Sequence, residues 1–230
     1  MHATNYEHHP ELGAWRARLA ELAAAAVAEQ GPDGAHDLNH LERVWRNAQA
    51  LLAHYPQADA LVVLAACYLH DLVNVPKNDP RRGSASRLSA QLASERLAAL
   101  DFPADKLPGV AHAIEAHSFS AAVHATTLEA RIVQNADRLD GLGLVGLARM
   151  FYIAGRMGSA LAHGSDALAR DRPLDDKAYA LDHIEAKLAR LPALMQTEAG
   201  RTLADARLAA LTDFRGAFAA EWSGVPDTGV

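Results

Sequence analysis

Residues 60–71 read Ala-Leu-Val-Val-Leu-Ala-Ala-Cys-Tyr-Leu-His-Asp and end in the pair His70 and Asp71. The first ten residues are apolar on every side, which is typical of a helix surrounded by other helices. An imidazole and a carboxylate at the end of such a helix offer two metal-ligating groups on a rigid support. Adjacent helical side chains diverge by about 100°, so both can bind one ion only where the helix ends. The pair therefore needs partner ligands from elsewhere in the chain.

Apolar residues recur at helical spacing along most of the sequence. The predicted helices cover residues 11–30, 38–54, 58–70, 84–100, 105–116, 126–137, 142–162, 175–191 and 197–222. The predicted N-caps are Asp37, Ser84 and either Thr126 or Thr127. The glycines at 141, 143 and 146 indicate a close approach between helices. No alternating strand pattern is present, so we expect an all-α protein.

The composition favours one domain spanning residues 1–230. We expect its core over about 15–220, the range of the family resemblance given below, and flexible ends at 1–10 and 224–230. Acidic residues outnumber basic ones by 28 to 22, which argues against nucleic acid polymers and anionic membranes as partners. The single cysteine, Cys67, excludes an intramolecular disulfide and fits a reducing compartment. The first thirty residues lack the order of a signal peptide, and no apolar stretch is long enough to span a bilayer. We therefore predict a soluble, cytoplasmic protein.

Two segments contain candidate partners for the pair at 70 and 71. His36 and His40 lie four residues apart, on nearly the same side of a predicted helix, and either could be a ligand. Asp137 follows an apolar helical stretch, so its carboxylate is predicted to lie against the core, where it needs a cation.

With His40, His70, Asp71 and Asp137 in this order, the sequence resembles the HD-domain superfamily of metal-dependent phosphohydrolases. The pattern of that superfamily is a histidine, a His-Asp pair and a distant aspartate, so the resemblance implies that these four residues bind one metal ion. It also implies an HD-domain helical bundle. Further motifs look like those of small stand-alone bacterial HD hydrolases, which include nucleotide pyrophosphohydrolases. These motifs are His36-Asp37-x-x-His40-x-x-Arg43-Val44, Pro76-Lys77-Asn78, Ala116-His117-Ser118-Phe119-Ser120 and Leu174-Asp175-Asp176-Lys177.

Two imidazoles and two carboxylates suit a first-row divalent ion better than Ca²⁺. Mn²⁺ is our first choice, with Fe²⁺, Co²⁺, Ni²⁺, Mg²⁺ or Zn²⁺ as alternatives. Four ligands on a six-coordinate ion leave one position for a phosphoryl oxygen and one for a water whose pKa falls from 15.7 toward about 7. The expected reaction is hydrolysis of a phosphoanhydride or phosphate monoester of a nucleotide-like small molecule.

The loop after the metal pair adds polar and positive groups that could bind the phosphates, namely Lys77, Asn78, Arg81 and Arg82. We expect Lys77 to contribute most, acting with Asp71 in catalysis. His36 and Asp37 are expected to orient His40 rather than to bind the ion themselves.

Two further residues have alternative interpretations. His117 could donate a proton to the leaving oxygen or hold a second phosphate, or it could simply cap a helix C-terminus. Lys177 could contact a phosphate, because its segment resembles a substrate-facing part of the family, or it could lie on a solvated helix face.

Two other functions stay open. One is an HD domain that senses a nucleotide without cleaving it. The other is an oxidase with a diiron centre, which needs extra ligands between Asp71 and Asp137. His112 and His117 are about 140° apart on one helix, which argues against their acting as a ligand pair.

The sequence leaves open the substrate, the native metal, and whether pyrophosphate or phosphate is released. It also leaves open a homodimer formed through an apolar helical face.

Overall fold

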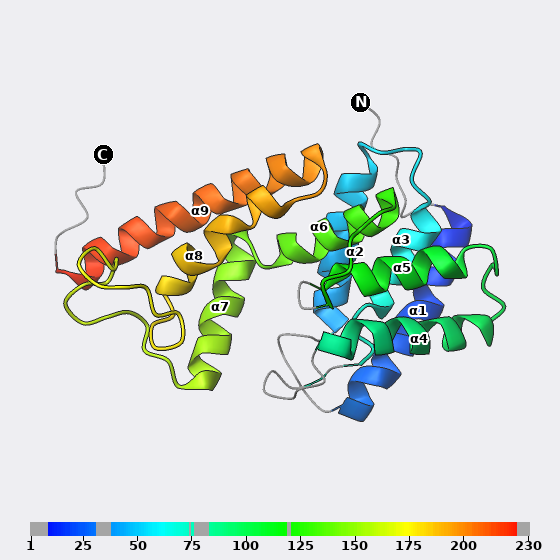
Figure 1. Ribbon diagram of the computed structural model, residues 1–230, viewed down its shortest axis with the longest axis horizontal. Coiled ribbons are helices and arrows are strands. Elements are labelled where there is room, and N and C mark those ends of the chain that lie inside the picture. Colours follow the sequence, from blue (N-terminus) through cyan, green and yellow to red (C-terminus); the bar gives the residue numbers. More distant parts are fainter. Residues whose placement is uncertain (1–8, 31–37, 74, 76–82, 119–120, 225–230) are drawn as a thin grey trace. The chain divides into compact units, whose positions relative to one another are not determined.

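A computed structural model describes residues 9–30, 38–73, 75, 83–118 and 121–224 (Figure 1). These residues form helices joined by turns, with one isolated parallel bridge between Ala160 and Tyr179 and no strand. The all-α prediction is confirmed. The α-helices are α1 (Pro10–Gln30), α2 (Leu38–Leu52), α3 (Ala60–Leu69), α4 (Ala85–Ala98), α5 (Leu107–His117), α6 (Leu128–Asp140), α7 (Gly143–Met157), α8 (Asp182–Ala186) and α9 (Glu198–Trp222).

The chain divides into two compact units, residues 1–137 and 138–230. The boundary falls inside α6, so this helix contributes to both units. The first unit contains α1 to α5 and most of α6, and the second contains α7, α8 and α9 with the short 3₁₀ helices η4 (Leu188–Arg190) and η5 (Pro192–Leu194). The prediction of a single domain stays a prediction, because two compact units can belong to one domain.

Helix α3 is the centre of the first unit, as its sequence predicts. Nine consecutive residues, 61–69, are buried, and the helix contacts α1, α2 and α5. It begins at residue 60 rather than 58 because the Asp59 side chain accepts hydrogen bonds from the backbone N–H groups of Leu61 (3.0 Å) and Val62 (3.2 Å).

A cluster of three polar side chains near the end of α3 joins three helices. Arg16 of α1 donates to the Tyr68 hydroxyl (3.0 Å) and to the carboxylate of Glu42 in α2 (2.6 Å). The Tyr68 hydroxyl in turn donates to Glu42. Burial, together with the bond to Glu42, raises the pKa of Tyr68, so this group keeps its proton. The contacts fix the end of α3 against α2, next to His70.

The predicted caps are found in part. Thr127, rather than Thr126, is the N-cap of α6, since its hydroxyl accepts from the N–H of Ala130 (3.2 Å). Ser84 occupies the cap position of α4, but its side chain makes no capping bond. Asp37 and the ends at 1–8 and 225–230 lie outside the described residues.

Two predicted helices of the second unit are wrong in extent. Helix α7 ends at Met157, and not at 162, because Gly158 takes a left-handed conformation (φ 75°) that stops the helix. Residues 175–181 form turns instead of the start of a helix, and only residues 182–186 are α-helical in the predicted segment 175–191. Helix α9 is confirmed, with the Thr197 hydroxyl accepting from the N–H of Gly200 (3.1 Å).

Among the described residues, we find no helix with both the length and the apolar character needed to cross a membrane.

Candidate metal centre

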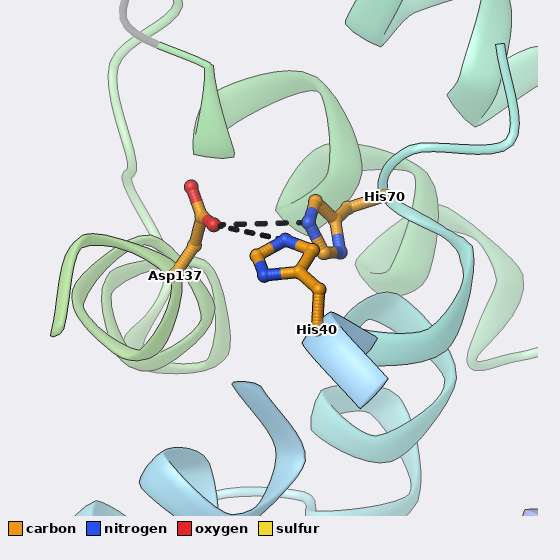
Figure 2. A group of neighbouring side chains, drawn as sticks. All are labelled: His40, His70 and Asp137. Atoms are coloured by element: carbon orange, nitrogen blue, oxygen red, sulfur yellow. Dashed lines mark ion pairs between the residues drawn. The ribbon is translucent and has the colours of Figure 1, made fainter. Parts of the chain in front are cut away.

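The predicted ligands come from three helices of the first unit. His40 lies in the first turn of α2, Asp137 near the end of α6, and His70 at the C-cap of α3 with Asp71 following it. Figure 2 shows the side chains of His40, His70 and Asp137 pointing toward one another. The segment after Asp71 is fixed to α4, because the N–H of Val73 donates to the buried hydroxyl of Ser89 (3.0 Å). The pair at 70 and 71 thus stands at a helix end, as a shared ion requires.

The four side chains converge at short range. The Nε2 atom of His40 is 3.5 Å from Oδ1 of Asp137 and 3.9 Å from Oδ2 of Asp71. The Nε2 atom of His70 is 3.8 Å from the same oxygen of Asp137 and 3.5 Å from the same oxygen of Asp71. Each imidazole therefore faces both carboxylates. The imidazoles are buried, whereas the Asp71 and Asp137 side chains are 32% and 29% exposed, so Asp137 is less buried than its sequence suggests.

The ring of His70 is held with one nitrogen directed into this cluster. Its Nδ1 donates to the carbonyl of Cys67 (2.9 Å), the preceding turn of its own helix. Burial lowers the pKa of His70, and the nearby aspartates oppose this only in part, so the ring is neutral. Its Nε2 therefore carries a lone pair, is buried, and has no hydrogen-bond partner among the described residues. An unpaired buried acceptor is costly unless a ligand completes it.

Asp71 also faces a third imidazole. The His117 Nε2 atom is 3.7 Å from Oδ1 of Asp71, on the other oxygen of that carboxylate. His117 is the last residue of α5, and its Nδ1 donates to the carbonyl of Ile114 (2.6 Å). The Nδ1 atom thus caps the end of α5, as one interpretation predicts, while the Nε2 atom faces the cluster and the catalytic role of His117 stays a prediction.

The charges of these groups support one another. Burial would raise the pKa of Asp71, but the surrounding imidazoles, His117 among them, hold it well below its usual value, so the carboxyl is ionised. Burial would lower the pKa of His117, but the ionised Asp71 carboxylate beside its Nε2 raises it above its usual value.

The donor set fits a divalent metal ion. Donor atoms that share a first-row ion lie about 3 to 3.5 Å apart, because each is about 2.0–2.2 Å from the metal. The separations of 3.5–3.9 Å are therefore close to what coordination needs. Two overlapping groups could hold an ion, His40 with His70 and Asp137, and His70 with Asp71 and His117. Oδ2 of Asp71 lies 3.5 Å and 3.9 Å from the two imidazole nitrogens of the first group, so the four side chains together offer the nitrogen and oxygen set expected from the sequence.

The described residues do not test the predicted phosphate contacts. His36 and the loop residues Lys77, Asn78, Arg81 and Arg82 lie outside the described ranges. Lys177 belongs to the second unit, where it is exposed in a turn, and its backbone N–H donates to the Asp175 carboxylate (3.1 Å). The roles of these residues stay predictions.

Sequence reasoning missed two buried amides beside the cluster. Asn47 Nδ2 donates to the carbonyl of Ala136 (3.0 Å), and Gln134 Nε2 donates to the carbonyl of Ala116 (2.7 Å). Each acceptor is the residue directly before a site residue, Asp137 or His117. A signal for Asn47 is present in the sequence, since it interrupts the apolar side of α2 seven residues after His40.

Comparisons with known proteins identify the family of this chain. The family model described as HD domain matches residues 37–142. An uncharacterised Bacillus subtilis protein, YpgQ, is 34% identical over 176 residues, which cover 75% of this chain and 77% of YpgQ. The crystal structure of YpgQ in complex with ADP has a TM-score of 0.68 at 26% identity, covering 90% of this chain and 94% of that one. An HD-superfamily hydrolase from Bacillus thuringiensis has a TM-score of 0.69 at 25% identity, covering 92% and 98%. From the family match and the similarity to YpgQ, the chain belongs to the HD domain family.

Proposed function

We propose that this protein is a metal-dependent phosphohydrolase that cleaves nucleotide-like phosphoanhydrides or phosphate monoesters. The observation that carries the proposal is the buried Nε2 of His70, which lacks a hydrogen-bond partner among the described residues and faces the carboxylates of Asp71 and Asp137. The hydrolase from Bacillus thuringiensis supports the reaction class. The complex of YpgQ with ADP supports a nucleotide as the substrate class.

The residues expected to hold the ion are His40, His70, Asp71 and Asp137. A divalent cation there supplies a Lewis acid that acidifies water and polarises a phosphoryl oxygen. The two imidazoles provide nitrogen donors on the buried side of the site, and the two carboxylates provide negative charge on its partly exposed side. This difference in exposure supports approach of the substrate from the carboxylate side. Mn²⁺ remains our first choice of ion.

The chain also offers groups for the substrate. His117 presents its Nε2 beside Asp71, where it can hydrogen-bond that carboxylate or a phosphoryl oxygen. Lys77, Arg81 and Arg82 are the cations that follow the metal pair in sequence, with Asn78 between them as a hydrogen-bonding partner. They are expected to meet the charge that develops on the phosphoryl group, with Lys77 foremost.

The test compares turnover by the unchanged protein, His70→Ala and Asp71→Ala. Metal-free protein is supplied with Mn²⁺ and incubated with nucleoside mono-, di- and triphosphates, and the phosphate and pyrophosphate released are measured separately. We expect each substitution to lower turnover at least about a hundredfold, since a loss of several kcal/mol of transition-state stabilisation corresponds to that factor. His54→Ala is the matched control, because His54 is exposed just after α2 and outside the cluster, and it should retain full turnover.

Equal turnover by all variants would contradict the proposal. Binding of ADP without any product would favour the nucleotide-sensing alternative.

A two-metal centre is the second candidate, because His117 provides a donor between Asp71 and Asp137 in the sequence and lies near Asp71. Elemental analysis of the same Mn²⁺-loaded samples separates one ion per chain, as we expect, from two.

A further inference from the structure

Helix α2 carries a second polar side chain on the side that carries His40. Asn47 follows His40 by seven residues, or about two helical turns, so the two side chains lie on nearly the same side. Both are buried, at 7% exposure for Asn47 and 1% for His40. A buried amide is costly unless it is hydrogen-bonded, and the position would otherwise suit an apolar residue.

The bond made by Asn47 joins α2 to α6 next to a proposed metal ligand. Its Nδ2 donates to the carbonyl of Ala136 over 3.0 Å, in a buried environment. Ala136 directly precedes Asp137, whose Oδ1 is 3.5 Å from Nε2 of His40. One side of α2 thus supplies a proposed ligand at one end and holds the backbone of another proposed ligand two turns further on.

A similar contact holds the neighbouring helix. Gln134 of α6 donates to the carbonyl of Ala116 over 2.7 Å. This carbonyl lies in the last turn of α5, where no later N–H group of the helix is available to donate a hydrogen bond to it. Two buried amides therefore link α2 to α6 and α6 to α5, each at the residue before a side chain of the cluster.

We propose that Asn47 is a positioning residue of the metal centre, which holds the backbone of α6 so that the Asp137 carboxylate meets the imidazoles of His40 and His70. In this proposal Asn47 acts through Asp137 and is not itself a ligand of the ion. The inference rests on the proposed metal site. Groups that orient metal ligands typically contribute about 10- to 100-fold to metal affinity.

The experiment measures the Mn²⁺ dissociation constant by isothermal titration calorimetry on metal-free protein. The variant Asn47→Leu removes the donor at similar size. Val44→Ala is the control, because Val44 is fully buried one turn earlier on α2 and its loss weakens packing without touching the Ala136 carbonyl. All titrations are made well below the unfolding temperature of each variant, where the folded fraction is close to one and lost stability does not alter the measured constant.

We expect Asn47→Leu to weaken Mn²⁺ binding about tenfold or more, and Val44→Ala to leave it within about twofold of the unchanged protein. If Asn47→Leu does not fold, Asn47→Ser is used, because its hydroxyl is too short to replace the amide, and the same loss is expected. Mn²⁺ affinity unchanged in the folded Asn47 variant would overturn this inference alone, and so would an equal loss in Val44→Ala. No Mn²⁺ binding by the unchanged protein would overturn the proposed function and this inference together.

Discussion

Cys67 has separate roles for its backbone and its side chain. Its carbonyl fixes the His70 ring, while its thiol is fully buried in α3. Burial raises the pKa of the thiol, with the charge of Asp137 adding to this effect. The thiolate is the form that reacts with disulfide reagents. We therefore expect the native protein not to react with Ellman's reagent, and to release one equivalent of chromophore when guanidinium chloride is added. Rapid labelling of the native protein would show that α3 opens to solvent.

Single residues were predictable where their chemistry is local. His40, His70, Asp71 and Asp137 were found through their types and their order, and the structure brings them together. The partners that orient them were not found. The acceptor of Asn47 is a backbone carbonyl 89 positions away, and a carbonyl of Ala136 has no signature in the sequence. Such a pair is set by how two helices pack, which a single sequence does not specify.

Elements were predictable where apolar periodicity and caps agree. Helices α1, α2, α3 and α9 match their predicted ranges to within a few residues at the ends. The segment between α7 and α8 was predicted wrongly because hydrogen bonds of buried side chains fix its turns. Arg172 makes two bonds to the buried carboxylate of Asp182 (2.6 and 2.8 Å), which also accepts from the backbone N–H of Asp175 (2.8 Å). Helical spacing within 175–191 does not reveal a competing contact of this kind.

The glycines of α7 allow a test at the level of one helix. A Cβ atom on Gly146 would lie 2.2 Å from the carbonyl oxygen of Gly141, whereas one on Gly155 would meet nothing within 4 Å. We expect Gly146→Ala to lower the free energy of unfolding by at least about 1–3 kcal/mol through overpacking. The matched change Gly155→Ala should raise it by about 0.5–1 kcal/mol, since alanine favours the helix. Urea unfolding measures both, and equal effects would show that the close approach at Gly146 is absent.

The two compact units raise the question of whether they unfold together. All described donors of the proposed metal centre belong to the first unit, so a metal ion can directly stabilise only that unit. Helix α6 runs from Leu128 to Asp140 and crosses the boundary at residue 137. Breaking one unit therefore disturbs a helix of the other, and formation of a helix is cooperative along its length. We expect one unfolding transition, in line with the single domain predicted from the sequence.

Calorimetry with and without Mn²⁺ tests this expectation. An ion present at 100 times its dissociation constant stabilises the folded state by about 2.7 kcal/mol. For a chain of 230 residues that unfolds in one transition, this stabilisation corresponds to a rise in Tm of about 5–10 °C. If the two units unfold together, the whole transition should move to higher temperature, because metal binding to the first unit then stabilises the entire cooperative structure. His70→Ala is the control, and its Tm should not respond to Mn²⁺, since the site has lost a buried donor. Two transitions, of which only one moves with Mn²⁺, would show instead that the units unfold independently and that α6 does not couple them.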